Sequence, residues 1–329
     1  MGIKKLLKFL NNYDNLTNYK NISDYKGQKI AIDISLLIYQ IIIGSRNSGS
    51  DIINNKGESV THILGLFNKI IFLLKNDIIP VFIFDGKPSK LKNQTLHDRR
   101  KTKLMYVHKL KEVTNETDRI KYLKKTVYIG RKELNECREL LDMMGIPYIN
   151  APEEADSQCA YLAKEGFVDA VYSDDMDILT FGSPIIIKNL ISLKNKPIEL
   201  NLNSILEKLN LSYDEFIDFC ILLGCDYSNG ISNINYNVIY EYYLRNRNIE
   251  STLKNLKEDN FNVPLLLNYK EIKKYYKEGP YIEITNLEIK PMNYELLINT
   301  LVNKYGLLKF KIINKLNQLS VLETHKFNI

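Results

Sequence analysis

The chain of 329 residues contains little cysteine and histidine, and it has no long hydrophobic segment. None of its four cysteines forms a CxxC pair, which favours reduced, buried thiols over disulfides. The longest apolar run, near residues 36–43, is interrupted by Gln40 and is too short to span a membrane. The apolar part of the N-terminal segment contains charges, which is not typical of a secretory signal. These absences favour an intracellular protein that is neither secreted nor inserted in a membrane.

Positive charge is concentrated in one segment. Residues 87–132 contain 15 Lys and Arg against 4 Asp and Glu, a local net charge of +11. The whole chain carries +6, so the remainder carries −5. This separation is typical of a protein that attracts a polyanion with one surface and acts on it with another, although a solvated basic helix is the alternative. We predict a partly helical insertion that is mobile when unbound.

Continuous apolar runs alternate with helical patterns. The runs at 29–33, 80–84 and 170–172 all end at or just before aspartates. This alternation predicts an α/β fold with a mostly parallel central sheet flanked by helices on both faces. Functional residues collect at the carboxyl ends of strands in such sheets, so these aspartates are expected on one rim. Further strands are expected at 185–187 and 197–200, and helices at 2–10, 36–43 (with Ser35 as the N-cap), 60–75, 131–144, 203–209, 212–223 and 293–316.

Two close carboxylate pairs lie within residues 151–182, namely Glu154 with Asp156 and Asp175 with Asp177. Like charges raise each other's pKa and oppose folding, so a group of carboxylates usually surrounds a cation. Helix capping and solvation are the alternative for the acidic residues that follow Pro152. Residues two apart point to opposite sides of a helix, so Glu154 and Asp156 are expected to share a site only at a helix entry.

Seven stretches together resemble the flap endonucleases of the structure-specific 5′ nuclease superfamily. They are, in chain order, MGIKKLLKFL, KIAIDISLLIYQ, GESVTHILGLFNKI, IPVFIFDGKPSKLK, MGIPYINAPEEADSQCAYL, SDDMDILTFGSP and CILLGCDY. The resemblance implies a PIN-like nuclease core within a single domain, 1–329. Its parts would be an N-terminal nuclease region (1–95), a helical arch (87–132), an internal nuclease region (136–226), and a helix–two-turn–helix with C-terminal helices (227–329).

The resemblance also implies roles in catalysis and metal binding. Lys92 and Arg99, in the arch, would act on the scissile phosphate. The family usually has Glu where Asp156 stands. An oxygen-only ligand set suits Mg²⁺ or Mn²⁺ rather than zinc, and Glu153 and Asp174 are expected to be solvated neighbours of the ligands. The implied metal ligands are Asp33, Asp85, Glu154, Asp156, Asp175, Asp177 and Asp226.

DNA contacts follow from the same resemblance. Tyr39 would stack on a base near the cut, and Gly2 would lie beside the active site as the processed N-terminus. Arg46 and Lys69 match positions that contact the template strand.

The turn of the implied helix–two-turn–helix departs from the family pattern. Residues 232–237 read SNINYN, where the family has a glycine-rich turn that carries side-chain cations. Asparagine tolerates left-handed backbone, so Asn233 and Asn235 are expected to preserve the turn. Its backbone carbonyls are then expected to hold K⁺ and to contact duplex DNA, although the missing cations predict weaker binding.

These features predict a structure-specific 5′ flap endonuclease that cuts DNA near single-strand/double-strand junctions in replication and repair. Two Mg²⁺ ions are expected, with Mn²⁺ as a substitute. The alternatives are a related 5′–3′ exonuclease or gap endonuclease, and a catalytically silent nucleic-acid-binding scaffold. The expected partner is branched DNA with a 5′ flap. No clamp-binding motif is recognised, so recruitment by a sliding clamp is not expected. We expect a monomer in the nucleus or at another site of DNA replication.

Overall fold

The computed structural model describes residues 2–192, 194–264, 266 and 268–326, with side chains described as far as residue 319. The chain folds into two compact units that alternate along the sequence. The first unit comprises Met1–Ile22, Asp85–Leu96 and Ala151–Glu283. The second comprises Ser23–Phe84, His97–Asn150 and Ile284–Ile329. The predicted subdivision into nuclease regions, arch and C-terminal helices stays a prediction.

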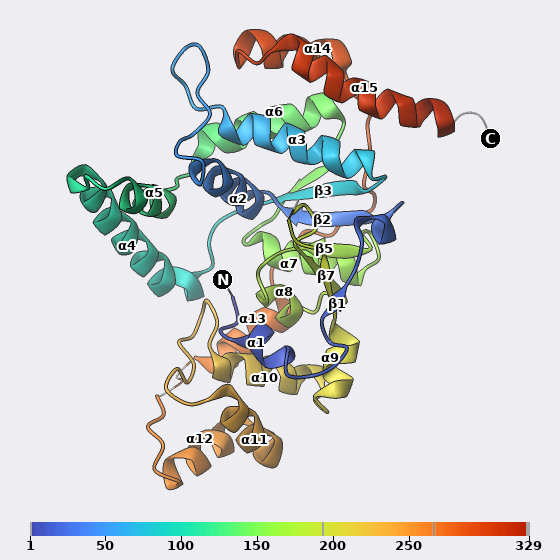
Figure 1. Ribbon diagram of the computed structural model, residues 1–329. Helices are drawn as coiled ribbons and strands as arrows, with labels where there is room; N and C mark the ends of the chain where they lie inside the picture. Colours follow the sequence, from blue (N-terminus) through green and yellow to red (C-terminus); the bar gives the residue numbers. More distant parts are fainter. Residues whose placement is uncertain (1, 193, 265, 267, 327–329) are drawn as a thin grey trace. The chain divides into compact units, whose positions relative to one another are not determined.

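The second unit is built on three parallel strands. β2 (Lys29–Asp33) pairs with β3 (Ile79–Phe84), which pairs in turn with β4 (Tyr148–Asn150). β3 is buried from its second residue to its last, which explains its continuous apolar sequence. Helices pack beside these strands and against one another (Figure 1). They are α2 (Ile34–Arg46), α3 (Thr61–Lys75) and α6 (Arg131–Met144).

Asp33 begins α2, and this corrects the expectation that Ser35 is the cap. The Oδ1 atom of Asp33 accepts hydrogen bonds from the backbone N–H groups of Ser35, at 2.8 Å, and Leu36, at 3.1 Å. Aspartate is among the strongest N-cap residues, so the helix starts two residues earlier than its apolar pattern indicates. Asp33 is also paired in register with Ile83, at the carboxyl end of β3.

Four strands and most of the short helices belong to the first unit. β5 (Ala170–Tyr172) is parallel to β6 (Ile185–Lys188), while β7 (Ile198–Asn201) is antiparallel to β6 and to the short β1 (Asn18–Tyr19). β1 and β4 were not expected from the sequence. The helices are α1 (Leu6–Leu10), α7 (Ala155–Lys164), α8 (Asp177–Thr180), α9 (Leu202–Lys208), α10 (Tyr213–Leu223), α11 (Tyr236–Asn246), α12 (Ile249–Glu258) and α13 (Tyr269–Glu278).

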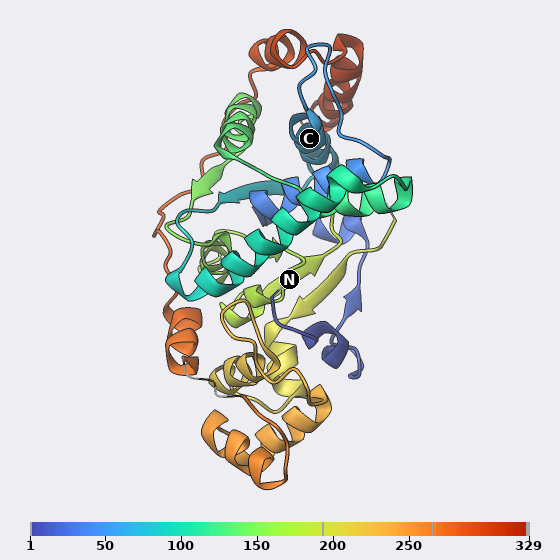
Figure 2. The ribbon, with the colours of Figure 1, turned by 90° about the vertical axis from the view of Figure 1, so that its left-hand side faces the viewer.

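The basic segment is helical over most of its length, more than the partly helical insertion that was predicted. It contains a 3₁₀ turn (Lys90–Lys92), α4 (Asn93–Glu112) and α5 (Glu116–Lys125). No residue of α4 or α5 is fully buried, and the rings of Tyr106 and Tyr122 are 5.5 Å apart between the two helices. Figure 2 shows the two helices, in teal and green. A long helix without a buried face presents its lysines and arginines to solvent.

Two expected helices differ from the structure. The N-terminal helix begins only at Leu6, because Lys5 has a left-handed backbone, with φ of 61°. The C-terminal pattern is divided into α14 (Tyr294–Asn299), a π-helical turn (Thr300–Lys304) and α15 (Lys309–Lys326). Gly306, with φ of 66°, lies at the break, where helical geometry cannot continue.

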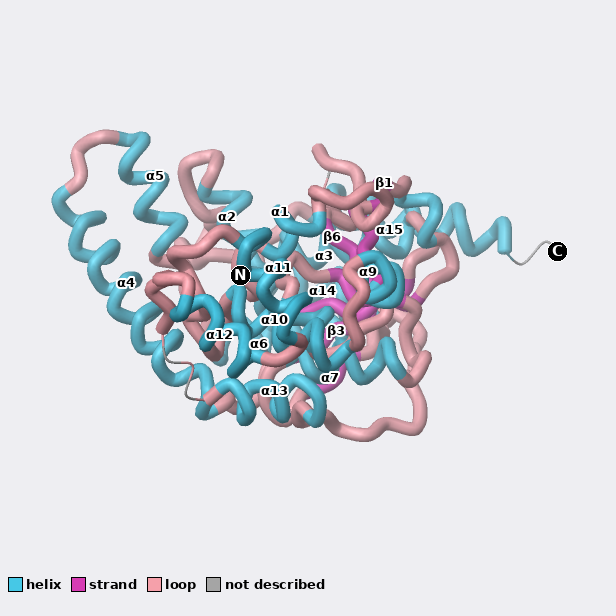
Figure 3. Tube along the Cα trace, turned by 90° about the horizontal axis from the view of Figure 1, so that it is seen from below, coloured by secondary structure: helices cyan, strands magenta, loops and turns pink. Residues whose placement is uncertain are grey.

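The strand pairings confirm the predicted fold class. Three of the five pairings within the two units are parallel, and helices pack against strands in both units. Figure 3 distinguishes the helices, in cyan, from the short strands, in magenta. None of the described helices combines the length and the hydrophobicity needed to cross a bilayer.

The packing of α2 on α3 depends on Gly65. A Cβ atom at this position would lie 2.2 Å from Cγ2 of Ile41, whose branched side chain has little freedom to move. We therefore expect Gly65→Ala to lower the free energy of unfolding by about 1–3 kcal/mol. Urea denaturation followed by circular dichroism measures the change.

Gly44→Ala is the matched control for this prediction. Gly44 also lies in a helix, but nothing lies within 4 Å of the Cβ that it would gain. We expect this variant to be stabilised by up to about 1 kcal/mol, because alanine has the higher helix propensity. Equal effects of the two substitutions would contradict the role of Gly65.

Candidate active site

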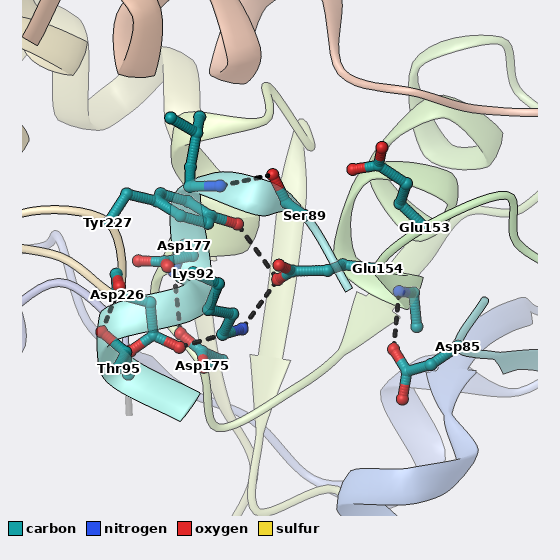
Figure 4. Close-up of polar contacts among 12 residues, drawn as sticks. Asp85, Ser89, Lys92, Thr95, Glu153, Glu154, Asp175, Asp177, Asp226 and Tyr227 are labelled. Carbon is teal, nitrogen blue, oxygen red and sulfur yellow. Dashed lines mark hydrogen bonds and ion pairs between the residues drawn. The ribbon is translucent and has the colours of Figure 1, made fainter. Parts of the chain in front are cut away.

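Six of the seven predicted carboxylate ligands belong to the first unit, and the seventh, Asp33, belongs to the second. The six come from four stretches of sequence. They are Asp85, Glu154, Asp156, Asp175, Asp177 and Asp226. Figure 4 shows five of them, all except Asp156, together with Lys92.

Glu154 and Asp156 lie at the entry of α7, as their spacing requires. Glu154 is the N-cap and has an extended backbone, with φ −78° and ψ 143°, whereas Asp156 lies in the first helical turn. In a regular helix, side chains two residues apart point to opposite sides. Because the backbone changes conformation between Glu154 and Asp156, this restriction does not apply to them. An acidic side chain in a first turn is also favoured by the helix dipole. Capping and ligand geometry are therefore compatible here.

Asp85 is tied to the same helix entry. Its Oδ1 atom accepts a hydrogen bond from the backbone N–H of Ala155, at 2.9 Å. The neighbouring Gly86 donates its N–H to the carbonyl of Glu153, at 2.6 Å. A Cβ on Gly86 would lie 2.3 Å from the carbonyl oxygen of Ala151, so only glycine permits this backbone contact.

Asp175 and Asp177 are held by a tight turn after β5. Oδ1 of Asp175 accepts a hydrogen bond from the N–H of Asp177, at 3.1 Å, and Ser173 Oγ accepts one from the N–H of Asp175, at 2.9 Å. Gly2 lies against this pair, because a Cβ on Gly2 would lie 1.7 Å from Oδ1 of Asp175. The predicted nearness of Gly2 to the acidic group is therefore observed.

Lys92 connects two of the carboxylates. Its Nζ atom lies 2.7 Å from Oε2 of Glu154 and 3.0 Å from Oδ2 of Asp226. The hydroxyl of Thr95, in the first turn of α4, donates to the carbonyl of Asp226 at 2.6 Å. The start of the basic segment is thus fastened to the carboxylates, with the lysine that was predicted to act on phosphate as their counter-ion.

Burial and mutual repulsion raise the pKa values of several carboxyls. Burial raises the pKa of Asp177 well above its ordinary value, and the nearby Asp175 adds to the increase. Burial likewise raises the pKa of Asp175 and of Glu154, although Lys92 opposes the effect at Glu154. Burial lowers the pKa of Lys92, but Glu154, Asp226 and Asp156 more than offset this and hold it above its ordinary value. The group therefore holds more negative charge than one ammonium balances.

The donor atoms fit a hard divalent cation. Among the described residues, no group of three or more His, Cys, Asp or Glu side chains is placed to hold a metal ion. Lys92 instead pairs with Glu154 and Asp226. However, Oε1 of Glu154 and Oδ1 of Asp177 are buried without a hydrogen-bond partner. Buried carboxylate oxygens are costly unless a donor or a cation satisfies them, and oxygen ligands are those that Mg²⁺ prefers.

The sequence did not reveal the aromatic and polar partners of the acidic group. The hydroxyl of Tyr227 donates to Oε2 of Glu154, at 3.0 Å, and that of Tyr275 donates to Oε2 of Glu153, also at 3.0 Å. Asp174 forms an ion pair with Lys188, at 3.6 Å. Glu153 and Asp174 were expected to be solvated neighbours of the ligands, but each has a side-chain partner. The only hint in the sequence that Tyr227 lies near the acidic group is that it directly follows Asp226.

The remaining predicted residues lie mainly in the second unit. Tyr39 is half-buried on α2, and Arg99 is exposed on α4. Burial lowers the pKa of Lys69, on α3. Arg46 forms two hydrogen bonds to the carboxylate of Asp51, at 2.8 and 2.9 Å, and a third to a carbonyl of α5 at 2.6 Å. Arg46 therefore links α2 to α5, a structural role beside the predicted DNA contact.

The altered turn between α10 and α11 is ordered by its asparagines. Asn235 is the N-cap of α11, and its side chain accepts a hydrogen bond from the N–H of Asn237 at 2.9 Å. The side chain of Asn233 donates to the carbonyl of Asn262, at 2.8 Å. The turn is formed without the glycines of the family pattern, because asparagine side chains supply the capping bonds.

Comparison with known proteins identifies the family. The XPG N-terminal domain matches residues 1–106, and the XPG I-region matches residues 145–226. Flap endonuclease 1 of Glycine max is 37% identical over 332 residues, covering 98% of this chain and 87% of the relative. That of Brugia malayi is 36% identical over 296 residues, covering 88% of this chain and 78% of the relative. The chain belongs to the flap endonuclease family.

Solved structures agree with this assignment. Flap endonuclease-1 from Methanococcus jannaschii is 35% identical, with a TM-score of 0.74 over 94% of this nuclease and 97% of that chain. The catalytic core of Rad2 in complex with DNA substrate is 24% identical, covers 97% of this chain and all of that chain, and has a TM-score of 0.77, which shows the shared fold. The flap endonucleases are structure-specific, Mg²⁺-dependent nucleases, so this chain is a nuclease of that type.

The raised pKa of Asp177 predicts how the stability of the nuclease depends on pH when a chelator is present. Its folded pKa exceeds its unfolded pKa of about 3.9, so the stability that it contributes is present at low pH and is lost as the pH rises through the folded pKa. We expect Asp177→Asn to weaken this decline and to raise the free energy of unfolding at pH 7 by about 1–3 kcal/mol. Urea denaturation in EDTA across the pH range measures both effects.

Asp14→Asn, which changes an exposed carboxylate, is the control and should leave the profile unchanged. A chelator-treated Asp177→Asn protein less stable than the parent at pH 7 would show that the Asp177 charge is not a source of strain.

Proposed function

We propose that this nuclease cleaves 5′-flapped DNA near the single-strand/double-strand junction, using two Mg²⁺ ions that Mn²⁺ can replace. The observation that best supports the metal site is the acidic group of the first unit, in which Glu154 and Asp177 retain buried oxygens without a donor. Family membership supports the substrate. The proposed ligands are Asp85, Glu154, Asp156, Asp175, Asp177 and Asp226, joined by Asp33 of the second unit.

The ions, when bound, would supply the positive charge that activates water and stabilises the leaving oxygen of an in-line displacement. Asp175 and Asp177 are pre-ordered for this task by the backbone turn that joins them. Asp85 is pre-ordered by its bond to Ala155. Because these contacts use one oxygen of each carboxylate of Asp85 and Asp175, the side chains are oriented before any ion arrives.

Lys92 has two successive roles in this proposal. In the absence of ions its ammonium neutralises Glu154 and Asp226. With a divalent ion held by these carboxylates, the Lys92 ammonium would be released from them and would be available to oppose the negative charge that develops on the scissile phosphate. Arg99, further along α4, adds a second positive charge, and ordering of the arch on DNA brings both side chains into place.

The DNA contacts are proposed to follow the basic and aromatic side chains. Tyr39 would stack on a base, a contact worth roughly 1–3 kcal/mol. Arg46 and Lys69 would contact the template strand, with Gly2 beside the cut. The turn at Asn233 and Asn235 would bind duplex DNA with K⁺. We further propose that the protein acts as a monomer, without recruitment by a sliding clamp, in the nucleus or at another site of DNA replication.

Cleavage of a labelled 5′-flap substrate tests this function. We expect one main product, cut near the junction, in Mg²⁺ or Mn²⁺ and none in EDTA. Changing Asp175 and Asp177 together to Asn should slow cleavage by about 100-fold or more, because the charge that holds the ions is lost. Mononucleotide products would indicate an exonuclease instead, and binding without cleavage would indicate a silent scaffold.

The turn between α10 and α11 gives a second test. Adding a cation by Asn233→Lys should strengthen binding to duplex DNA, and the slope of log K against log salt should steepen by about 0.9 for one added phosphate contact. Binding is measured by fluorescence anisotropy in Ca²⁺ over a range of salt.

Asn195→Lys, on an exposed loop between β6 and β7, controls for net charge. If both variants steepen the slope equally, the turn is not a duplex contact.

A further inference from the structure

Tyr227 donates a neutral hydrogen bond to Glu154, beside the charged bond from Lys92. Its hydroxyl donates to Oε2 of Glu154 at 3.0 Å, and the ammonium of Lys92 reaches the same oxygen at 2.7 Å. Figure 4 shows the two donors converging on one end of the carboxylate. The other oxygen, Oε1, is buried and has no hydrogen-bond partner. Two donors on one oxygen thus set which oxygen remains for another ligand.

The position of the Tyr227 hydroxyl is set by aromatic packing. The Tyr227 ring makes edge-to-face contacts with Tyr275, at 5.2 Å between centroids, and with Tyr276, at 5.4 Å. Tyr276 is almost fully buried. Such contacts restrict ring rotation, so the hydroxyl is directed at Glu154 by a rigid support.

The two donors on Glu154 differ in charge and freedom. Lys92 carries a positive charge on a flexible side chain, so it competes with any cation for this carboxylate. Tyr227 is neutral, and it donates without cancelling the negative charge of Glu154. A neutral donor to a ligating carboxylate is the arrangement that orients metal ligands in proteins and tunes their affinity.

We propose that Tyr227 is a positioning residue that orients the Glu154 carboxylate for divalent metal binding and remains bonded to it after Lys92 leaves. This inference rests on the proposed function, since it assigns Glu154 to the metal site. It makes Tyr227 part of the metal-binding apparatus without direct contact with ion or DNA.

Tyr275 provides a matched control within the same aromatic cluster. Its hydroxyl donates to Oε2 of Glu153 at 3.0 Å, the same distance as the Tyr227 bond. Glu153 is not among the proposed ligands. Tyr275→Phe therefore removes an equivalent hydroxyl–carboxylate bond one residue away from Glu154, and it keeps the ring.

The experiment measures Mn²⁺ affinity by calorimetry on the full chain without DNA. We expect Tyr227→Phe to weaken Mn²⁺ binding by about 10-fold, within the range for lost outer-shell contacts, and Tyr275→Phe to leave it unchanged. In cleavage assays, Tyr227→Phe should need more Mg²⁺ for half-maximal rate while the KM for flap DNA stays the same. In a Glu154→Gln background, the loss of the Tyr227 hydroxyl should have no further effect on Mn²⁺ affinity.

Three outcomes would overturn the proposal. If Tyr227→Phe binds Mn²⁺ with unchanged affinity, Tyr227 does not orient Glu154 for metal binding, while the proposed function still stands. Equal losses in the two Tyr→Phe variants assign the effect to the packing of the cluster. If the parent protein itself binds no Mn²⁺ and cleaves no flap in Mg²⁺, the proposed function fails together with the inference.

Discussion

The ion pairs of Lys92 with Glu154 and Asp226, at 2.7 and 3.0 Å, are the contacts on which the first unit depends most. Asp175, Asp177 and Glu154 are all buried, and burying a carboxylate without compensation is costly. The Lys92 ammonium moderates this cost but does not remove it, because the pKa values of these carboxyls remain raised. The acidic group is therefore held together under electrostatic strain, which a divalent cation would relieve.

The backbone supplies the rigidity that this strain requires. Asp85 and the N–H of Gly86 both bond to the entry of α7, and Asp175 accepts a bond from Asp177 two residues along. Gly86 allows two backbone segments to approach more closely than any side chain would permit. These contacts orient the carboxylates through peptide groups, which do not titrate and cannot leave.

The basic and the aromatic side chains have different roles, which follow from their chemistry. Most of the lysines and arginines of α4 and α5 are exposed, on helices without a buried face, so they can meet a polyanion. The tyrosines around Glu154 are packed ring against ring, so they act as neutral, fixed donors. Lys92, at the start of the basic segment, pairs with Glu154, the carboxylate to which Tyr227 also donates.

Much of the molecule was predictable because its signals are local. The apolar run of β3, the amphipathic pattern of α6 with its Gly145 cap, and the identity of the acidic residues can all be read from short windows. Prediction from such short windows was wrong where two local signals compete for the same helix end or where a helix is interrupted. Asp33 rather than Ser35 caps α2, and the C-terminal pattern is broken near Gly306.

The sequence by itself determined which residue types follow the strands, where the positive charge lies and to which family the chain is similar. Only the tertiary structure decided which oxygen of Glu154 is engaged, that Lys92 is its counter-ion and that Tyr227 is its second donor. The physical reason is distance along the chain. Propensity and periodicity act over a few residues, whereas these bonds join atoms 62 and 73 residues apart, and the packing of the whole unit sets their positions.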